Sequence, residues 1–105
     1  MAEPIMASFL VFLARGSGVS KDRLASEFES RGMTCHLESG EGSDIFEFLG
    51  SSDTLYLITD GENVRRAELN PDYRARPRIH DRIYDVLEAL GYEHLDEDDP
   101  RIAAE

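Results

Sequence analysis

Few side chains in this sequence stand at a spacing that supports catalysis or metal binding. Cys35 is followed by His36, but neighbouring residues of a strand point to opposite faces, so this imidazole cannot act as the base for the thiol. His80 and His94 are isolated, have no paired-ligand spacing, and are expected at the surface. The acidic run 96–99 lacks the interleaved spacing and the glycine of a calcium loop. The residues therefore predict neither an enzyme nor a metal protein, and no cofactor is expected.

The turn Arg15–Gly18 has the composition of an anion-binding loop. It stands between an expected strand and the N-terminus of an expected helix, where backbone N–H groups and the helix dipole attract phosphate or carboxylate. It lacks, however, the third glycine of a dinucleotide fingerprint and the lysine pattern of a P-loop. We interpret the turn as a flexible connection, and an anion site there is the alternative.

Arginines concentrate in one segment. Six arginines and three acids lie between Arg65 and Arg82, and Tyr73 stands among them, which suits a contact with a small anion or RNA. We favour internal compensation, in which this basic segment lies against the acidic C-terminal residues. Two pairs at helical spacing would add to it, Arg78–Asp81 and Arg82–Asp85.

The net charge limits the classes of molecule that the protein is expected to bind. The 105 residues include 22 acids and 11 lysines and arginines, for a formal net charge of −11. Nucleic acid and anionic membranes repel such a surface, whereas a basic protein attracts it. Solubility, or adaptation to a high-salt cytoplasm, explains the same acidity without any partner.

Two weaker signals indicate the cellular compartment of the protein. The longest apolar run, 7–14, is too short to span a membrane, and Glu3 precedes it where a signal peptide needs a cation. Cys35, the single cysteine, cannot form an internal disulfide and is expected to be a buried, inert thiol. We expect a cytoplasmic protein.

Hydrophobic periodicity and turn signals predict the elements. Ser20 is a suitable helix N-cap, Gly32 and Gly91 are suitable helix stops, and Asp60-Gly61 is a hairpin turn. The expected strands are 6–14, 33–38, 44–50, 54–59, 62–69 and a short one at 92–95, and the expected helices are 21–31 and 78–90. The polar strand 62–69 is expected at an edge of the sheet.

These elements predict an α+β fold. We expect a two-layer sandwich in which a mostly antiparallel sheet carries two helices on one face, in a ferredoxin-like arrangement with an inserted hairpin. Residues 1–95 form the single domain, and residues 96–105 form a solvated acidic tail.

The second face of the sheet needs a cover. Strands 6–14 and 54–59 are apolar on both sides, and two helices cover only one. A second copy, a partner protein or an apolar ligand would serve. The residues expected on this face are Leu10, Phe12, Tyr56 and Ile58.

The leading hypothesis is a non-enzymatic acidic module that docks on a basic, nucleic-acid-processing protein, as toxin-immunity proteins and phage-encoded inhibitors do. The alternative is a small dimeric ligand-sensing or regulatory domain that uses the open sheet face. Direct binding to nucleic acid or membrane is not expected. The expected partner contacts are Glu38, Glu41, Asp44, Asp60, Glu62, Asp96, Glu97, Asp98 and Asp99.

Overall fold

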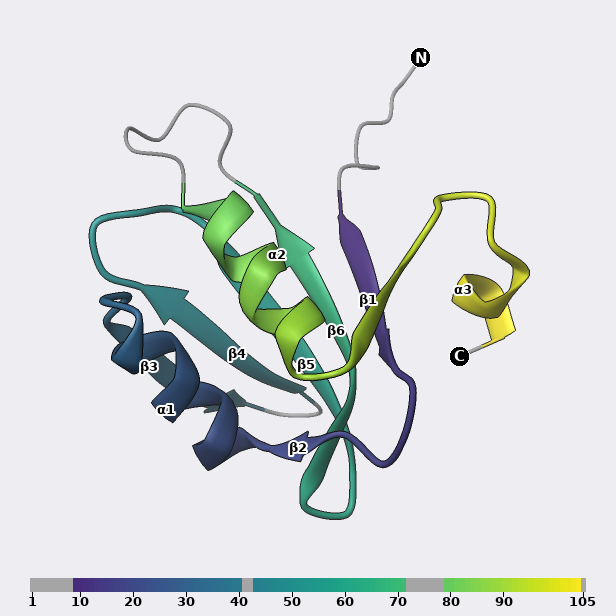
Figure 1. Cartoon of the computed structure of the whole chain (residues 1–105), viewed down its shortest axis with the longest axis horizontal. Coiled ribbons are helices and arrows are strands. Elements are labelled where there is room, and N and C mark those ends of the chain that lie inside the picture. Colours follow the sequence, from purple (N-terminus) through teal and green to yellow (C-terminus); the bar gives the residue numbers. More distant parts are fainter. Residues whose placement is uncertain (1–8, 41–42, 72–78, 105) are drawn as a thin grey trace.

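A computed structural model of the chain describes residues 9–40, 43–71 and 79–104, and these form an open antiparallel sheet with two main helices on one face (Figure 1). The elements are β1 (Leu10–Ala14), β2 (Val19–Ser20), α1 (Lys21–Ser30), β3 (Cys35–Gly40), β4 (Ser43–Phe48), β5 (Thr54–Asp60), β6 (Asn63–Asn70), α2 (His80–Ala89), β7 (Tyr92–Leu95) and α3 (Pro100–Ala104). The predicted α+β class is confirmed.

The seven strands follow the order β3-β4-β5-β6-β1-β7, and β2 pairs with β6 beyond the end of β1. In a ferredoxin-like sheet, the strand after the first helix lies beside the strand before the second helix. Here β4 and β5 lie between β3 and β6. The ferredoxin-like arrangement is therefore not confirmed and stays a prediction.

Helix α1 begins and ends where its local signals predict. The Ser20 side chain accepts a hydrogen bond from the backbone N–H of Arg23, which satisfies one of the free amides of the first turn. Gly32 has φ +84°, the left-handed conformation that ends many helices. Leu24 and Phe28 are fully buried and fix the face that α1 turns to the sheet.

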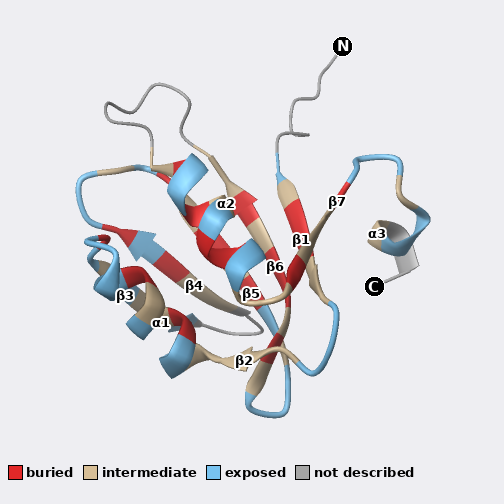
Figure 2. Ribbon diagram, in the orientation of Figure 1, coloured by how far each residue is buried: buried red, intermediate tan, exposed pale blue. Residues whose placement is uncertain are grey.

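Helix α2 packs beside α1 through a longer apolar stripe. Its buried side chains include Ile83, Val86 and Leu87, and Gly91 follows it with φ +93°. The stripe joins Phe12 of β1 and Leu24 of α1 in one core cluster, so both helices cover the same face (Figure 2).

Strand β6 overturns one prediction. Its polar residues suggested an edge strand, but β6 lies between β5 and β1 and is paired on both sides. Val64, Ala67 and Leu69 are fully buried towards the helices. Arg66 pairs with Glu68 on the opposite face, at 2.8 Å, so the charges of this strand compensate each other inside the sheet.

The turn Arg15–Gly18 is shaped by a buried tyrosine. The Tyr92 hydroxyl accepts a hydrogen bond from the Val19 N–H (3.1 Å) and donates one to the Val64 carbonyl (2.5 Å), so it joins β2, β6 and β7. Gly18 has φ +83°, and a side chain there would overlap the Val64 oxygen. The Val19 amide, which follows this turn, is thus already used.

We predict that Tyr92→Phe lowers the free energy of unfolding by about 1–3 kcal/mol, because it leaves the Val19 N–H and the Val64 carbonyl without their partner. Urea denaturation measures the change. Tyr56→Phe is the matched control, since this tyrosine lies on the half-exposed side of β5. Equal losses in the two variants would show that the bridging hydroxyl has no special role.

Candidate functional site

The acids predicted as partner contacts lie at separate places on the fold. Glu38 belongs to β3 at one edge of the sheet, whereas Asp96 follows β7 at the other edge. Five strand spacings of about 4.8 Å, or roughly 24 Å, separate those edges. Asp60 and Glu62 lie at the turn between β5 and β6, at the far end of these strands from Asp96 (Figure 1). Glu41 lies outside the described residues.

Three of these predicted contacts, Glu38, Asp44 and Asp99, are engaged within the chain. Asp44 accepts a hydrogen bond from the Lys21 ammonium at 2.8 Å, and this bond, followed by one from Ser39, holds the pKa of the Asp44 carboxyl below its ordinary value. Glu38 contacts the imidazole of its strand neighbour His36 at 2.7 Å. The charge of the Asp44 carboxylate is therefore largely compensated by Lys21 and contributes little to the binding of a partner.

Part of the C-terminal acidic segment is held by ion pairs. The segment forms α3, and the Arg101 guanidinium binds Asp99 at 2.8 Å and Glu93 of β7 at 3.1 Å. Hydrogen bonds from Arg101 lower the pKa of both carboxyls. The three acids before this clamp stay exposed, namely Asp96, Glu97 and Asp98.

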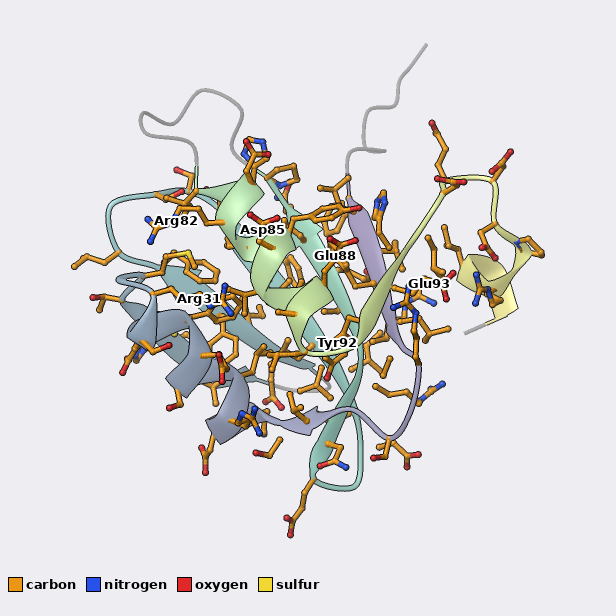
Figure 3. The ribbon with its side chains drawn as sticks, in the orientation of Figure 1. Arg31, Arg82, Asp85, Glu88, Tyr92 and Glu93 are labelled. Atoms are coloured by element: carbon orange, nitrogen blue, oxygen red, sulfur yellow. The ribbon has the colours of Figure 1, made fainter. Side chains whose placement is uncertain are left out.

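A second line of acids runs along α2. Asp81, Asp85 and Glu88 are exposed and recur at the spacing of one helix face, opposite the buried stripe. Arg82 does not pair with Asp85 as predicted, because its guanidinium donates to the Arg31 carbonyl at the end of α1. Figure 3 shows Arg82 directed towards α1 and away from the acids of α2. This side of the helix therefore keeps its negative charge.

Tyr84 lies where the two groups of acids meet. Burial raises the pKa of its phenol, and the charges of Glu88, Asp85 and Asp96 raise it further, in that order. Its ring packs edge-on against Phe12 at 5.2 Å and lies 5.3 Å from the His94 ring. The Phe12 and His94 rings thus hold the Tyr84 ring in place, and its phenol lies near three carboxylates.

We name Asp85, Glu88 and Asp96 around Tyr84 the acidic surface. None of these three carboxylates forms an ion pair with a cation in the part of the chain that the structure describes. A half-buried tyrosine ringed by uncompensated carboxylates is suited to an arginine or lysine side chain of another protein. Of these residues, the sequence prediction included only Asp96.

The face assignment of β1 was wrong. Phe12 was expected on the open face, but it is fully buried under α2, and Leu10 packs against the same core. Alternation along a strand shows which residues share a face, and β1 is apolar on both faces, so the pattern could not show which of them the helices cover. Tyr56 and Ile58 do lie on the open face, and Tyr56 contacts the Phe9 ring at 5.6 Å.

Part of the open face is covered from within the chain. Arg66 of β6 is only 6% exposed, and its guanidinium donates to the Ile102 carbonyl of α3 at 3.0 Å. This contact is with a backbone carbonyl, and the acid that Arg66 pairs with is Glu68 of its own strand, so the expected compensation of segment 65–82 by the C-terminal acids stays a prediction. Arg74, Arg76 and Arg78, with Tyr73, lie outside the described residues. On the uncovered part, Phe9 and Ile58 are the exposed apolar residues.

The remaining candidate groups do not assemble a reactive site. Burial, and then the charge of Glu29, raise the pKa of the Cys35 thiol and keep it protonated. His80 is 6% exposed and His94 is half-buried, which corrects their predicted surface positions. Within the described ranges, no three His, Cys, Asp or Glu side chains are placed to hold a metal ion.

A shallow pocket of about 490 Å³ opens at the start of β3, the end of β4 and the start of β5. Cys35 and Phe48 contribute to its apolar wall. The buried Asp53 lies at its rim and is held by the Ser51 hydroxyl, so this carboxylate is committed to the turn. The pocket gives a small apolar molecule a place to bind but offers no evident catalytic group.

The acidic surface predicts a measurable titration. In Asp85→Asn/Glu88→Gln/Asp96→Asn, the pKa of Tyr84 should fall towards its ordinary value and stay above it, because the contribution of burial remains. Tyrosine-selective NMR titration resolves this phenol from the others. The control carries Asp22→Asn/Asp60→Asn/Glu62→Gln, which removes equal charge elsewhere. A Tyr84 pKa that responds equally in both variants would disprove the local convergence of charge.

Compared with known proteins, the chain matches no family model, no curated protein and no solved structure. Among the described residues, no helix is long and apolar enough to cross a membrane.

Proposed function

We propose that this chain is a non-enzymatic protein-binding module that docks a basic protein on its acidic surface. One observation carries the proposal, namely that Asp85, Glu88 and Asp96 converge on the phenol of Tyr84 without a compensating cation in the described part of the chain. The net charge of −11 adds a long-range attraction to the same class of partner.

The composition of the surface supports a specific contact rather than charge alone. Tyrosine is enriched among the residues that dominate binding energies, because it buries a large ring and keeps a hydroxyl for hydrogen bonding. Packing on Phe12 and His94 holds the Tyr84 ring before any partner arrives. Less side-chain freedom is then lost on binding. Asp85 and Glu88, which are exposed, can exchange their water for a guanidinium at the rim.

The proposed class is an inhibitor or immunity-type protein. Enzymes that process nucleic acid carry a cationic groove for phosphates, and a carboxylate-rich surface can occupy that groove. Attraction between opposite charges accelerates the encounter and orients the two proteins. The basic target is the partner that follows from this chemistry, and nucleic acid itself is repelled.

The test uses an arginine-rich peptide as a defined probe and maps its binding by NMR titration of the whole chain. We expect the largest shifts at Tyr84 and its neighbours, and at least about tenfold weaker binding by Asp85→Asn/Glu88→Gln/Asp96→Asn. The matched control, Asp22→Asn/Asp60→Asn/Glu62→Gln, should bind nearly as the parent does. Equal weakening in both variants would mean that only net charge matters.

A second arm uses the natural partner. Proteins captured from the native host at low salt should be lost with the acidic-surface variant and retained with the control variant. Added salt should release them, because screening weakens attraction between exposed charges. Capture that is unaffected by salt and by the variant would refute the proposed mechanism and leave acidity as an adaptation to the host.

The second candidate is a small dimeric ligand-sensing or regulatory domain. The observation that favours it is the exposed apolar pair Phe9 and Ile58 on the open face, together with the pocket beside Cys35. A thermal shift with small apolar metabolites, absent with the arginine-rich peptide, would select this function.

A further inference from the structure

Strand β3 is an edge of the sheet, and among the described residues it is paired only with β4. The edge contains no proline and no lysine, the residues that most often block pairing with another chain. Its exposed residues include His36, Glu38 and Ser39. Such an edge is a ready template for an added strand.

The phase of the β3–β4 ladder shows which backbone groups point outward. The Leu49 N–H donates to the Thr34 carbonyl at 2.9 Å, and these two residues continue the register of the hairpin. Hydrogen-bonded pairs alternate along an antiparallel ladder, so His36 and Glu38 also bond to β4. The residues whose N–H and C=O point away from the sheet are therefore Cys35, Leu37 and Ser39.

We propose that a second copy of this chain pairs with β3 antiparallel, with the twofold axis at Leu37. Leu37 then lies opposite Leu37 of the second copy, and Cys35 lies opposite Ser39. All three outward-pointing residues of each strand form hydrogen-bonded pairs. Both sets of helices lie on the same side of one continuous sheet, because the axis is perpendicular to it.

Side-chain hydrogen bonding favours the same register. His36 of one copy stands directly opposite Glu38 of the other, on the open face, and symmetry repeats the pair. Shifting the register by two residues, which keeps the backbone phase, places His36 opposite His36 or Glu38 opposite Glu38. Each shift also loses a hydrogen-bonded pair. The backbone phase and the pairing of an imidazole with a carboxylate thus agree on one arrangement.

This inference goes beyond the proposed function and does not depend on it. The acidic surface adjoins β7 at the other edge of the sheet, so a dimer through β3 leaves it free on both copies. Salt separates the two interactions. Screening reduces the repulsion between two chains of net charge −11 and should strengthen the dimer, whereas it should weaken binding of a basic partner.

Analytical ultracentrifugation of the full chain over a wide concentration range tests the dimer. We expect a dimer that Leu37→Pro weakens by at least about tenfold, because proline removes an outward N–H that β4 does not use. Leu37→Ala keeps this N–H, loses similar packing, and should still dimerise. Thermal unfolding checks that both variants fold. A parent that stays monomeric, or equal weakening in both folded variants, would overturn the proposal.

The register has its own test. Ser39→Cys places a new thiol opposite Cys35 of the second copy, at a separation that a disulfide can bridge. Within one chain the two thiols lie four residues apart along an extended strand and cannot meet. In a mild redox buffer the variant should form a covalent dimer, while Asp60→Cys, an exposed control, should form far less. Equal yields would reject the register.

Discussion

The hydroxyl of Tyr92 is the point on which the sheet and the first helix depend. It connects the N–H of Val19 to the carbonyl of Val64, and it comes from the strand that follows the last core helix. Segments that are far apart in the chain therefore meet at one buried oxygen. Burial raises the pKa of this phenol, which remains a hydrogen-bond donor. Helix α1 begins at Lys21, two residues after Val19, so the hydrogen bond to Val19 helps to set the position of α1 relative to the sheet.

Much of the architecture could be predicted because it follows from local signals. The cap at Ser20 and the alternating residues of the two hairpins each specify their own element. The order of strands does not follow from such signals. In the central strand β6, the guanidinium of Arg66 binds Glu68 and a backbone carbonyl of α3. In the sequence, an arginine whose partner lies in a distant segment cannot be told apart from an exposed arginine.

The candidate site was harder to predict for a related reason. Net charge identified the class of partner, but the location of uncompensated charge depends on which acids find a cation. Lys21 neutralises Asp44, and Arg101 neutralises Asp99, whereas Glu88 has no such neighbour among the described residues. The helical spacing of Asp81, Asp85 and Glu88 was the available signal. The sequence predicts pairs of Asp81 with Arg78 and of Asp85 with Arg82, because it does not show in which direction the Arg82 side chain points.

Strands β1 and β2 run along the same side of β6, one after the other. Leu13 is opposite Arg66 and Val19 is opposite Val64, so the intervening residues leave the ladder and return to it across a single position of β6. In the part of the chain that the structure describes, a side chain at Gly16 would meet nothing within 4 Å, whereas both ends of this detour are held by the flanking pairs. Loop closure becomes only slowly more costly with length. Extra residues at Gly16 would extend a surface loop and leave the pairing on either side unchanged, which makes this detour a natural place to graft a peptide or a fluorescent reporter.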